Sequence, residues 1–151
     1  MITITRTDSD NPDFRSLVIL LDKDLSERDG NEHAFYAQFN NINKIKHALV
    51  AYKNKQPVGI GALRQYAENS MEVKRMFVLP GYRGEGIAAT ILSALETWAK
   101  EMNFKTCILE TGKKQPEAIN LYQKAGYSIT ENYGQYENVE NSVCMKKEIS
   151  T

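Results

Sequence analysis

The segment V-L-P-G-Y-R-G-E-G-I-A-A-T, residues 78–90, connects the end of an expected strand to the start of an expected helix. Gly84 and Gly86 carry no Cβ atom, so the backbone at both positions can come close to a ligand. The first N–H groups of the helix lack intrahelical acceptors, and the helix dipole adds positive potential at the same point. Arg83 supplies a fixed positive charge with several donors. The segment therefore predicts a site for a phosphate-like anion.

Thr90, one turn into the helix, offers a hydroxyl donor to the same anion. A tight turn without a ligand is the simplest alternative, but such a turn rarely needs two glycines, an arginine and a helix start together. Residues 84–89 also fit the dinucleotide fingerprint G-x-G-x-x-G/A, with Glu110 as a ribose-binding acid at the end of the next strand. Residues 80–83 separate the strand from the first glycine, several strands precede it, and only 67 residues (151 minus 84) follow it. These features make a dinucleotide-binding domain the weaker hypothesis.

Hydrophobic periodicity on both sides of this segment predicts the other elements. The expected strands cover residues 2–7, 47–53, 57–65, 71–79, 105–110, 127–130 and 142–149. The expected helices cover residues 12–25, 84–102 and 116–125, and a weaker helical stretch contains Phe35 and Phe39. Asn11 can cap the first helix, and residues 54–56 form a hairpin turn. The order predicts one mixed α/β domain spanning residues 1–151.

The composition excludes several classes of protein. Lys and Arg equal Asp and Glu at 19 each, so the overall charge gives no reason to expect nucleic acid or an anionic membrane as partner. No apolar run approaches the roughly 20 residues of a membrane span, and the N-terminus lacks a signal-peptide pattern. Cys107 and Cys144 lie in expected strands and are read as buried free thiols. No metal-ligand spacing is present. We expect a cytoplasmic protein without a metal.

Two motifs in the second half of the chain carry a resemblance to a known family. Arg83-x-x-Gly86-x-Ala88 resembles the R/Q-x-x-G-x-G/A signature of the GNAT acyltransferases, and Val78-x-Pro80-x-x-Arg83 resembles the way in which that family leaves its fourth strand. The run A-I-N-L-Y-Q-K-A-G-Y, residues 118–127, is similar to the family's later A-x-x-L-Y-x-K-x-G-F/Y element. The motifs cover about residues 58–130, and the order of elements matches over nearly the whole chain.

The resemblance implies a fold and a coenzyme. It implies a single GNAT-type domain with a mixed, mostly antiparallel sheet flanked by helices, whose fourth and fifth strands splay apart. The pantetheine arm of acetyl-coenzyme A would lie in this gap, bonded to the backbone of Met76, Phe77 and Val78. The pyrophosphate would rest on the N–H groups of Arg83, Gly84, Glu85, Gly86, Ile87 and Ala88.

Two amide residues in or next to the helix expected at residues 116–125 concern the coenzyme arm. Asn120 would contact the coenzyme arm. The family often has asparagine where this chain has Gln115, so the hydrogen bond usual at that position is altered.

The resemblance also implies N-acetyl transfer to an amine, for which two residues stand out. Glu72 lies in M-E-V-K-R-M-F-V at a spacing similar to that of the general-base glutamate in the histone-acetylating branch. Strand alternation puts Glu72, Lys74, Met76 and Val78 on one side of the strand unless a bulge intervenes. The alternative for Glu72 is a solvent-facing glutamate paired with Lys74.

Tyr122 occupies the position of the family tyrosine that points at the coenzyme sulfur. Its phenol, with a pKa near 10, can protonate a leaving thiolate with a pKa near 8.5. The alternative is an aromatic ring packed on an amphipathic helix. Tyr133 and Tyr136 either form a wall of the acceptor site or only cover the edge of the core.

The leading hypothesis is therefore an acetyl-coenzyme A-dependent N-acetyltransferase acting on a primary amine of a small molecule or peptide. An acyl-coenzyme A-binding module of the same fold, without turnover, is the second. A homodimer is compatible with the pattern, and the sequence does not identify the amine.

Overall fold

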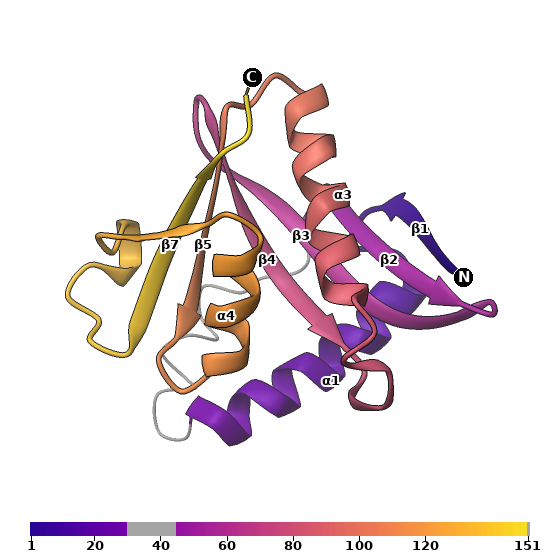
Figure 1. Cartoon of the computed structure of the whole chain (residues 1–151). Helices are drawn as coiled ribbons and strands as arrows, with labels where there is room; N and C mark the ends of the chain where they lie inside the picture. Colours follow the sequence, from indigo (N-terminus) through magenta and orange to yellow (C-terminus); the bar gives the residue numbers. More distant parts are fainter. Residues whose placement is uncertain (30–44, 151) are drawn as a thin grey trace.

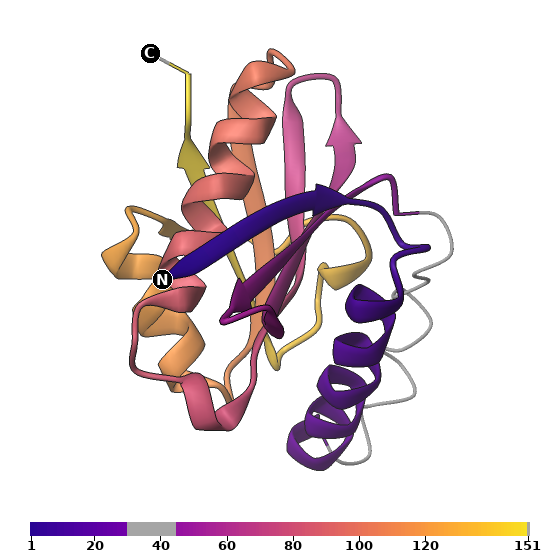
Figure 2. The same ribbon diagram turned by 90° about the vertical axis from the view of Figure 1, so that its right-hand side faces the viewer.

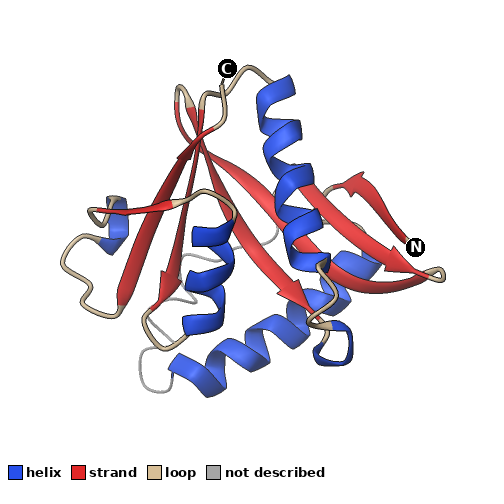
Figure 3. Cartoon of the chain, in the orientation of Figure 1, coloured by secondary structure: helices blue, strands red, loops and turns tan. Residues whose placement is uncertain are grey.

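A mixed sheet forms the frame of the protein (Figures 1 and 3). The structure is a computed structural model that describes residues 1–29 and 45–150. Within these residues the sheet has seven strands in the order β1-β2-β3-β4-β5-β7-β6. They are β1 (Ile2–Thr7), β2 (His47–Lys53), β3 (Gln56–Ala67), β4 (Ser70–Val78), β5 (Thr106–Gly112), β6 (Ser128–Thr130) and β7 (Ser142–Glu148). Neighbouring strands run antiparallel except β4 and β5, which are parallel. The expected mixed, mostly antiparallel sheet is confirmed.

The helices cover both faces of the sheet (Figure 2). Helix α1 (Pro12–Asp29) lies on one face, and α3 (Ile87–Glu101) lies on the other. Helix α4 (Pro116–Lys124) follows β5, and two short 3-10 turns cover Pro80–Tyr82 and Gly134–Tyr136. The helical stretch expected around Phe35 and Phe39 falls outside the described residues.

Local signals explain where the first helix and the first hairpin form. The Asn11 side-chain oxygen accepts a hydrogen bond from the Phe14 N–H at 3.0 Å, which confirms the expected N-cap. Asn54 and Lys55 join β2 to β3 with φ angles of 52° and 68°. A two-residue turn with positive φ at both central residues matches the right-handed twist of the strands that it joins.

Two apolar clusters hold the layers together. One lies under α3 and includes Ile91 and Leu95, and the other joins α1 to the opposite face through Phe14 and Phe77. Gly61 permits the close approach of α3, since a Cβ atom there would lie 2.7 Å from the Ile91 side chain. Cys107 and Cys144 are free and buried, as expected.

A β-bulge interrupts β4 at Arg75. Lys74 pairs with Ala62 and Phe77 with Ile60, so β4 has one more residue than β3 between these two pairs. Arg75 takes a φ of 59° at this point. The expectation that Glu72, Lys74, Met76 and Val78 share one side is therefore wrong. The bulge reverses the alternation, and Met76 and Val78 pack with the cluster under α3.

The parallel pair β4–β5 is short. Its register covers only Ser70–Val73 against Thr106–Leu109, although β4 continues to Val78 and β5 to Gly112. Beyond these four pairs the strands diverge, and Figure 1 shows the resulting V-shaped opening with α4 beside it. The expected splay of the fourth and fifth strands is confirmed.

Candidate active site

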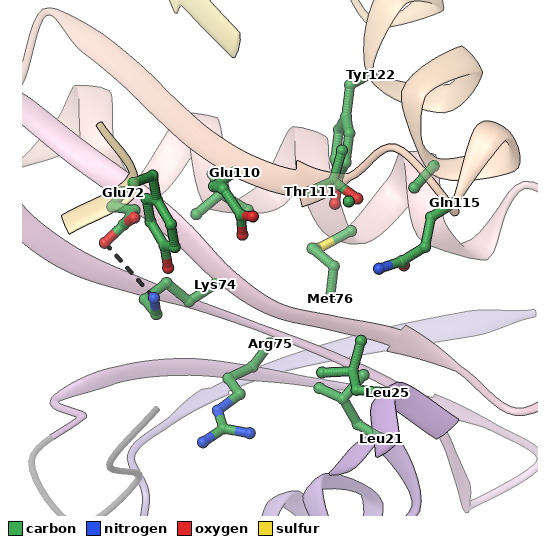
Figure 4. A pocket seen from close by; sticks show the side chains of 14 residues that line it. Leu21, Leu25, Glu72, Lys74, Arg75, Met76, Glu110, Thr111, Gln115 and Tyr122 are labelled. Atoms are coloured by element: carbon green, nitrogen blue, oxygen red, sulfur yellow. Dashed lines mark ion pairs between the residues drawn. The ribbon is translucent and has the colours of Figure 1, made fainter. Parts of the chain in front are cut away.

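A cavity occupies the opening between β4 and β5 (Figure 4). Helix α1, both strands and helix α4 all contribute to its wall, and one tyrosine of the loop before β7 completes it. The lining residues are Leu21, Leu25, Glu72, Val73, Lys74, Arg75, Met76, Glu110, Thr111, Gly112, Gln115, Ala118, Tyr122 and Tyr136. Three of the side chains singled out in the sequence, Glu72, Tyr122 and Tyr136, thus come together at one place.

Glu72 is buried in this wall, with only 3% of its surface exposed. The Tyr133 hydroxyl donates a hydrogen bond to its Oε2 at 2.6 Å, and Lys74 Nζ lies 3.7 Å from its Oε1. Burial raises the pKa of Tyr133, and the charge of Glu72 and this hydrogen bond raise it further. The alternative of a solvent-facing Glu72 is therefore wrong, although the pairing with Lys74 is present.

The charged side chain of Lys74 is only 10% exposed. Burial lowers the pKa of its ammonium group, while the charges of Glu72 and Glu110 oppose that shift. Arg75, the next residue, is also buried and forms an ion pair with Asp22 of α1 at 2.7 Å. The bulge thus gives two consecutive basic side chains to one cavity.

Glu110 is a second carboxylate of the cavity. Its Oε2 accepts a hydrogen bond from Ser142 Oγ at 2.7 Å. Glu72 pairs in register with Ile108, and Glu110 shares the face of Ile108 because strand side chains alternate. The sequence reading considered Glu110 only as a ribose-binding acid. The sequence does contain one signal for this cavity position, because Glu110 is an acid at the end of an otherwise apolar strand. The sequence does not reveal the parallel register that brings this strand beside the strand of Glu72.

Tyr122 belongs to α4 and is 7% exposed. Its ring packs in the cluster under α3 and meets the Tyr127 ring edge-on at a centroid distance of 5.9 Å. The residue also lines the cavity, so the packed-aromatic and active-site interpretations both describe it. Burial raises the pKa of its phenol, and the charge of Glu110 raises it further. The Tyr122 phenol is therefore protonated at neutral pH.

The glycine-rich segment lies at the N-terminal end of α3. Gly84 and Gly86 have φ angles of 83° and 81°, and a Cβ atom at either position would meet nothing within 4 Å. Helix α3 begins at Ile87, so its first N–H groups lack intrahelical acceptors. The Thr90 hydroxyl donates to the Gly86 carbonyl at 3.0 Å. Backbone donors thus converge at an exposed, sterically open point.

The charged residues of this segment already have contacts. Arg83 Nε donates to the Val78 carbonyl oxygen at 2.8 Å, and its guanidinium lies over the Phe77 ring at 5.5 Å from the centroid. Glu85 forms an ion pair with Lys53 at 2.5 Å. Residues 76–78 follow the last β4–β5 pair, so their backbone borders the opening.

The amides in and next to α4 do not lie as the sequence analysis expects. Gln115, the residue before α4, lines the cavity, so its amide reaches the site despite the departure from asparagine. Asn120 is exposed and is not among the lining residues.

Three tyrosines form a contiguous aromatic row beside the acids. The ring centroids of Tyr66 and Tyr133 are 4.9 Å apart, and those of Tyr133 and Tyr136 are 5.8 Å apart. Tyr66 is 45% exposed, whereas Tyr136 is 3% exposed and lines the cavity. The loop therefore covers the face that carries Glu72 and packs on Cys144 of β7.

This arrangement agrees with a known family. The model of the acetyltransferase (GNAT) family matches residues 13–127. The chain belongs to the GNAT acetyltransferase family. The dinucleotide-binding alternative is wrong, because a doubly wound parallel sheet is absent from the described strands, in which β4–β5 is the parallel pair.

Relatives and solved structures extend this match. IAA acetyltransferase of Azospirillum brasilense is 37% identical over 100 residues, which are 66% of this chain and 65% of that protein. The chain thus spans just under two thirds of that relative. A crystal structure from Klebsiella pneumoniae, of a candidate acyl-CoA N-acyltransferase, has 28% identity and a TM-score of 0.83 over 99% of both chains. A GNAT acetyltransferase of Elizabethkingia anophelis with acetyl-CoA bound shares the fold, with 19% identity and a TM-score of 0.73 over 97% of both chains.

The described residues lack two kinds of structural feature. None of their helices combines the length and the apolar character needed to cross a membrane. They also contain no group of three or more His, Cys, Asp or Glu side chains arranged to hold a metal ion.

Proposed function

We propose that this GNAT protein transfers an acetyl group from acetyl-coenzyme A to the primary amine of a small molecule or peptide. The observation that carries the proposal is the cavity between β4 and β5, which brings together the buried carboxylate of Glu72, the half-buried carboxylate of Glu110 and the buried phenol of Tyr122. The start of α3, where we place the pyrophosphate, follows the end of β4 after residues 79–86. A donor coenzyme and an acceptor amine can therefore meet at one point from opposite ends of the opening.

The coenzyme would lie along the edge of β4. Its pyrophosphate would take the N–H groups of residues 83–88, with Thr90 beside them, and its pantetheine arm would bond to the backbone of residues 76–78. The open space around Gly84 and Gly86 supports this arrangement, because no side chain blocks the approach of a phosphate. Gln115, the residue before α4, and Asn120 of α4 are the amides available to the arm.

Proton transfer would use the side chains of the cavity. A lysine-like amine with a pKa near 10.4 is almost wholly charged at neutral pH, so it must lose a proton before it attacks. Glu72 is our candidate for the acceptor of that proton. The amine nitrogen then forms a bond to the thioester carbonyl carbon, the carbon–sulfur bond breaks, and Tyr122 gives its proton to the leaving thiolate. The second proton lost by the nitrogen restores the Tyr122 phenol. Positioning of the two substrates can supply about 7–11 kcal/mol of the acceleration.

Tyr133 and Tyr136 would form the acceptor side of the site. Tyr133 binds Glu72 directly, and Tyr136 lines the cavity. These contacts support a role beyond covering the edge of the core. They also connect the loop before β7 to the candidate proton acceptor.

Calorimetric titration and an amine screen test this proposal. We expect acetyl-coenzyme A to bind and NAD not to bind, and we expect at least one amine to release coenzyme A thiol. Tyr122→Phe and Glu72→Gln should each slow turnover at least about tenfold, or about 1.4 kcal/mol. Binding without thiol release from any amine would indicate an acyl-coenzyme A-binding module without turnover. Binding of NAD in place of acetyl-coenzyme A would refute the proposal.

A further inference from the structure

The hydrogen bond between Tyr133 and Glu72 joins the loop before β7 to the candidate proton acceptor. The Tyr133 hydroxyl donates to Glu72 Oε2 at 2.6 Å. Glu72 is 3% exposed, and Tyr133 is half-buried. Burial of a carboxylate is unfavourable unless hydrogen bonds replace the water that it loses. The Tyr133 hydroxyl therefore replaces a water contact that burial takes from Glu72.

The two carboxylate oxygens of Glu72 have different surroundings. Oε2 accepts the short hydrogen bond from Tyr133, whereas Oε1 has Lys74 Nζ at 3.7 Å, which is longer than a hydrogen bond. Burial raises the pKa of the Tyr133 phenol, so the phenol keeps its proton and remains the donor at neutral pH. Oε1 is therefore the oxygen that can take a further proton.

Contacts within the loop and with β3 fix the position of the Tyr133 ring. The ring meets that of Tyr66 edge-on, with the two centroids 4.9 Å apart. Gly134, the next residue, has a φ of 52°, and a Cβ atom there would lie 3.3 Å from the Tyr66 side chain. Asn132 Nδ2 donates a hydrogen bond to the Val139 carbonyl oxygen at 3.0 Å across the loop. The ring thus has a fixed position from which its hydroxyl can orient a neighbour.

We propose that Tyr133 is a positioning residue, which holds the Glu72 carboxylate through Oε2 and leaves Oε1 to accept the proton of the amine. This inference rests on the proposed function. A glutamate side chain has several rotatable bonds, so an unheld carboxylate would adopt several orientations. A misplaced proton acceptor slows the reaction and leaves substrate binding unchanged. Tyr133 should therefore act on kcat, through Glu72, and have little effect on either KM.

A double-mutant cycle of Tyr133 and Glu72 tests this coupling. Tyr133→Phe removes the hydroxyl and keeps the ring. We expect it to lower kcat at least about fivefold and to change the KM of acetyl-coenzyme A and of the amine less than about twofold. In a Glu72→Gln background, Tyr133→Phe should change kcat less than about twofold, because the carboxylate that it positions is already gone. Effects that multiply in the double variant, or a larger change in KM than in kcat, would overturn the inference.

Tyr52→Phe is the matched control. It removes another hydrogen bond between a phenol and a carboxylate, from Tyr52 to Asp13 Oδ2 at 2.7 Å, and neither residue lines the cavity. We expect its kcat to equal that of the wild type. Gly134→Ala is a second variant of the loop, since it strains the backbone next to Tyr133 and leaves the hydroxyl in place. Its kcat should also fall, and it should fall no further when Glu72→Gln is added.

Turnover of the wild type separates the two possible failures. Release of coenzyme A thiol by the wild type with an amine, together with an unchanged kcat in Tyr133→Phe or in Gly134→Ala, refutes this inference alone. Absence of thiol release by the wild type with every amine refutes the proposed function and this inference with it.

Discussion

Glu72 and Glu110 are the same kind of side chain placed in different surroundings. Glu72 takes a phenol hydrogen bond from Tyr133 and lies beside Lys74, whereas Glu110 accepts from the Ser142 hydroxyl. We therefore propose proton acceptance for Glu72. This role should show in kcat more than in KM.

Tyr122 allows the sharpest test at the level of one residue. Tyr122→Phe removes the hydroxyl and keeps the ring, so packing under α3 is preserved. We expect kcat to fall at least about tenfold, or about 1.4 kcal/mol, with little change in acetyl-coenzyme A affinity. Tyr127→Phe is the control, since Tyr127 is a buried neighbour that does not line the cavity. Steady-state kinetics of both variants decide, and equal effects would contradict the role of Tyr122.

At the level of elements, the bulge in β4 is the point at which the sequence-based prediction of side-chain directions fails. Regular alternation predicts that the side chains of Glu72 and Met76 lie on the same face of β4. Arg75 adopts a positive φ between them, and the side chains after it therefore point to the opposite face from the one expected. Positive φ is uncommon for a residue other than glycine and leaves no periodic signal. Element order and the N-cap at Asn11 were predictable, because each depends on local chemistry. Helix α3 begins at Ile87, three residues later than the expected residue 84. The position of Glu110 near Glu72 depends on the long-range register of β4 with β5, which cannot be read from the sequence.

The glycine-rich segment offers a matched pair of substitutions. Gly86→Ala forces a Cβ into a φ of 81°, which costs roughly 1–2 kcal/mol of stability or displaces the first N–H groups of α3. We expect calorimetry to show several-fold weaker acetyl-coenzyme A binding. Gly81→Ala also meets open space but lacks the positive φ, so it should bind as the wild type does. Equal affinities of both variants would refute the proposed pyrophosphate site.

The β2–β3 hairpin offers a stabilising change away from the site. Asn54 and Lys55 both have positive φ, and Asn-Gly is the favoured pair for such a turn. Lys55→Gly should raise the free energy of unfolding by about 0.5–1 kcal/mol, while Lys55→Ala should not. Urea denaturation of the two variants measures the difference. A destabilised Lys55→Gly would show that the turn is not under strain.

At the scale of the whole molecule, buried phenols and thiols make stability depend on alkaline pH. Burial raises the pKa of the Cys107 thiol to about 12 and that of the Cys144 thiol to about 11. Burial likewise raises the pKa of the phenols of Tyr122, Tyr127, Tyr133 and Tyr136. Below the unfolded-state values the contribution of these groups to stability is complete. As pH rises past them, the unfolded chain releases protons that the folded chain retains, so the unfolding free energy falls.

We therefore expect stability to decline from about pH 9, where unfolded thiols ionise, and more steeply above about pH 10, where unfolded phenols ionise. Each group contributes up to about 1.4 kcal/mol per pH unit. Tyr127→Phe should reduce the steepness, and Tyr66→Phe, at a residue that is 45% exposed, should leave it unchanged. Urea midpoints between pH 8 and pH 11 provide the measurement. A flat profile would contradict the burial of these groups.

We propose that the opening between β4 and β5 brings a thioester and an amine together for acetyl transfer. The measurement that tests this is the ratio of coenzyme A thiol released to N-acetylated amine formed, followed in one reaction with the most active amine of the screen as acceptor. We expect one acetamide for each thiol, with both rates lowered at least about tenfold in Tyr122→Phe. Thiol release without acetylated amine, or a ratio and rate unaffected by Tyr122→Phe, would contradict it.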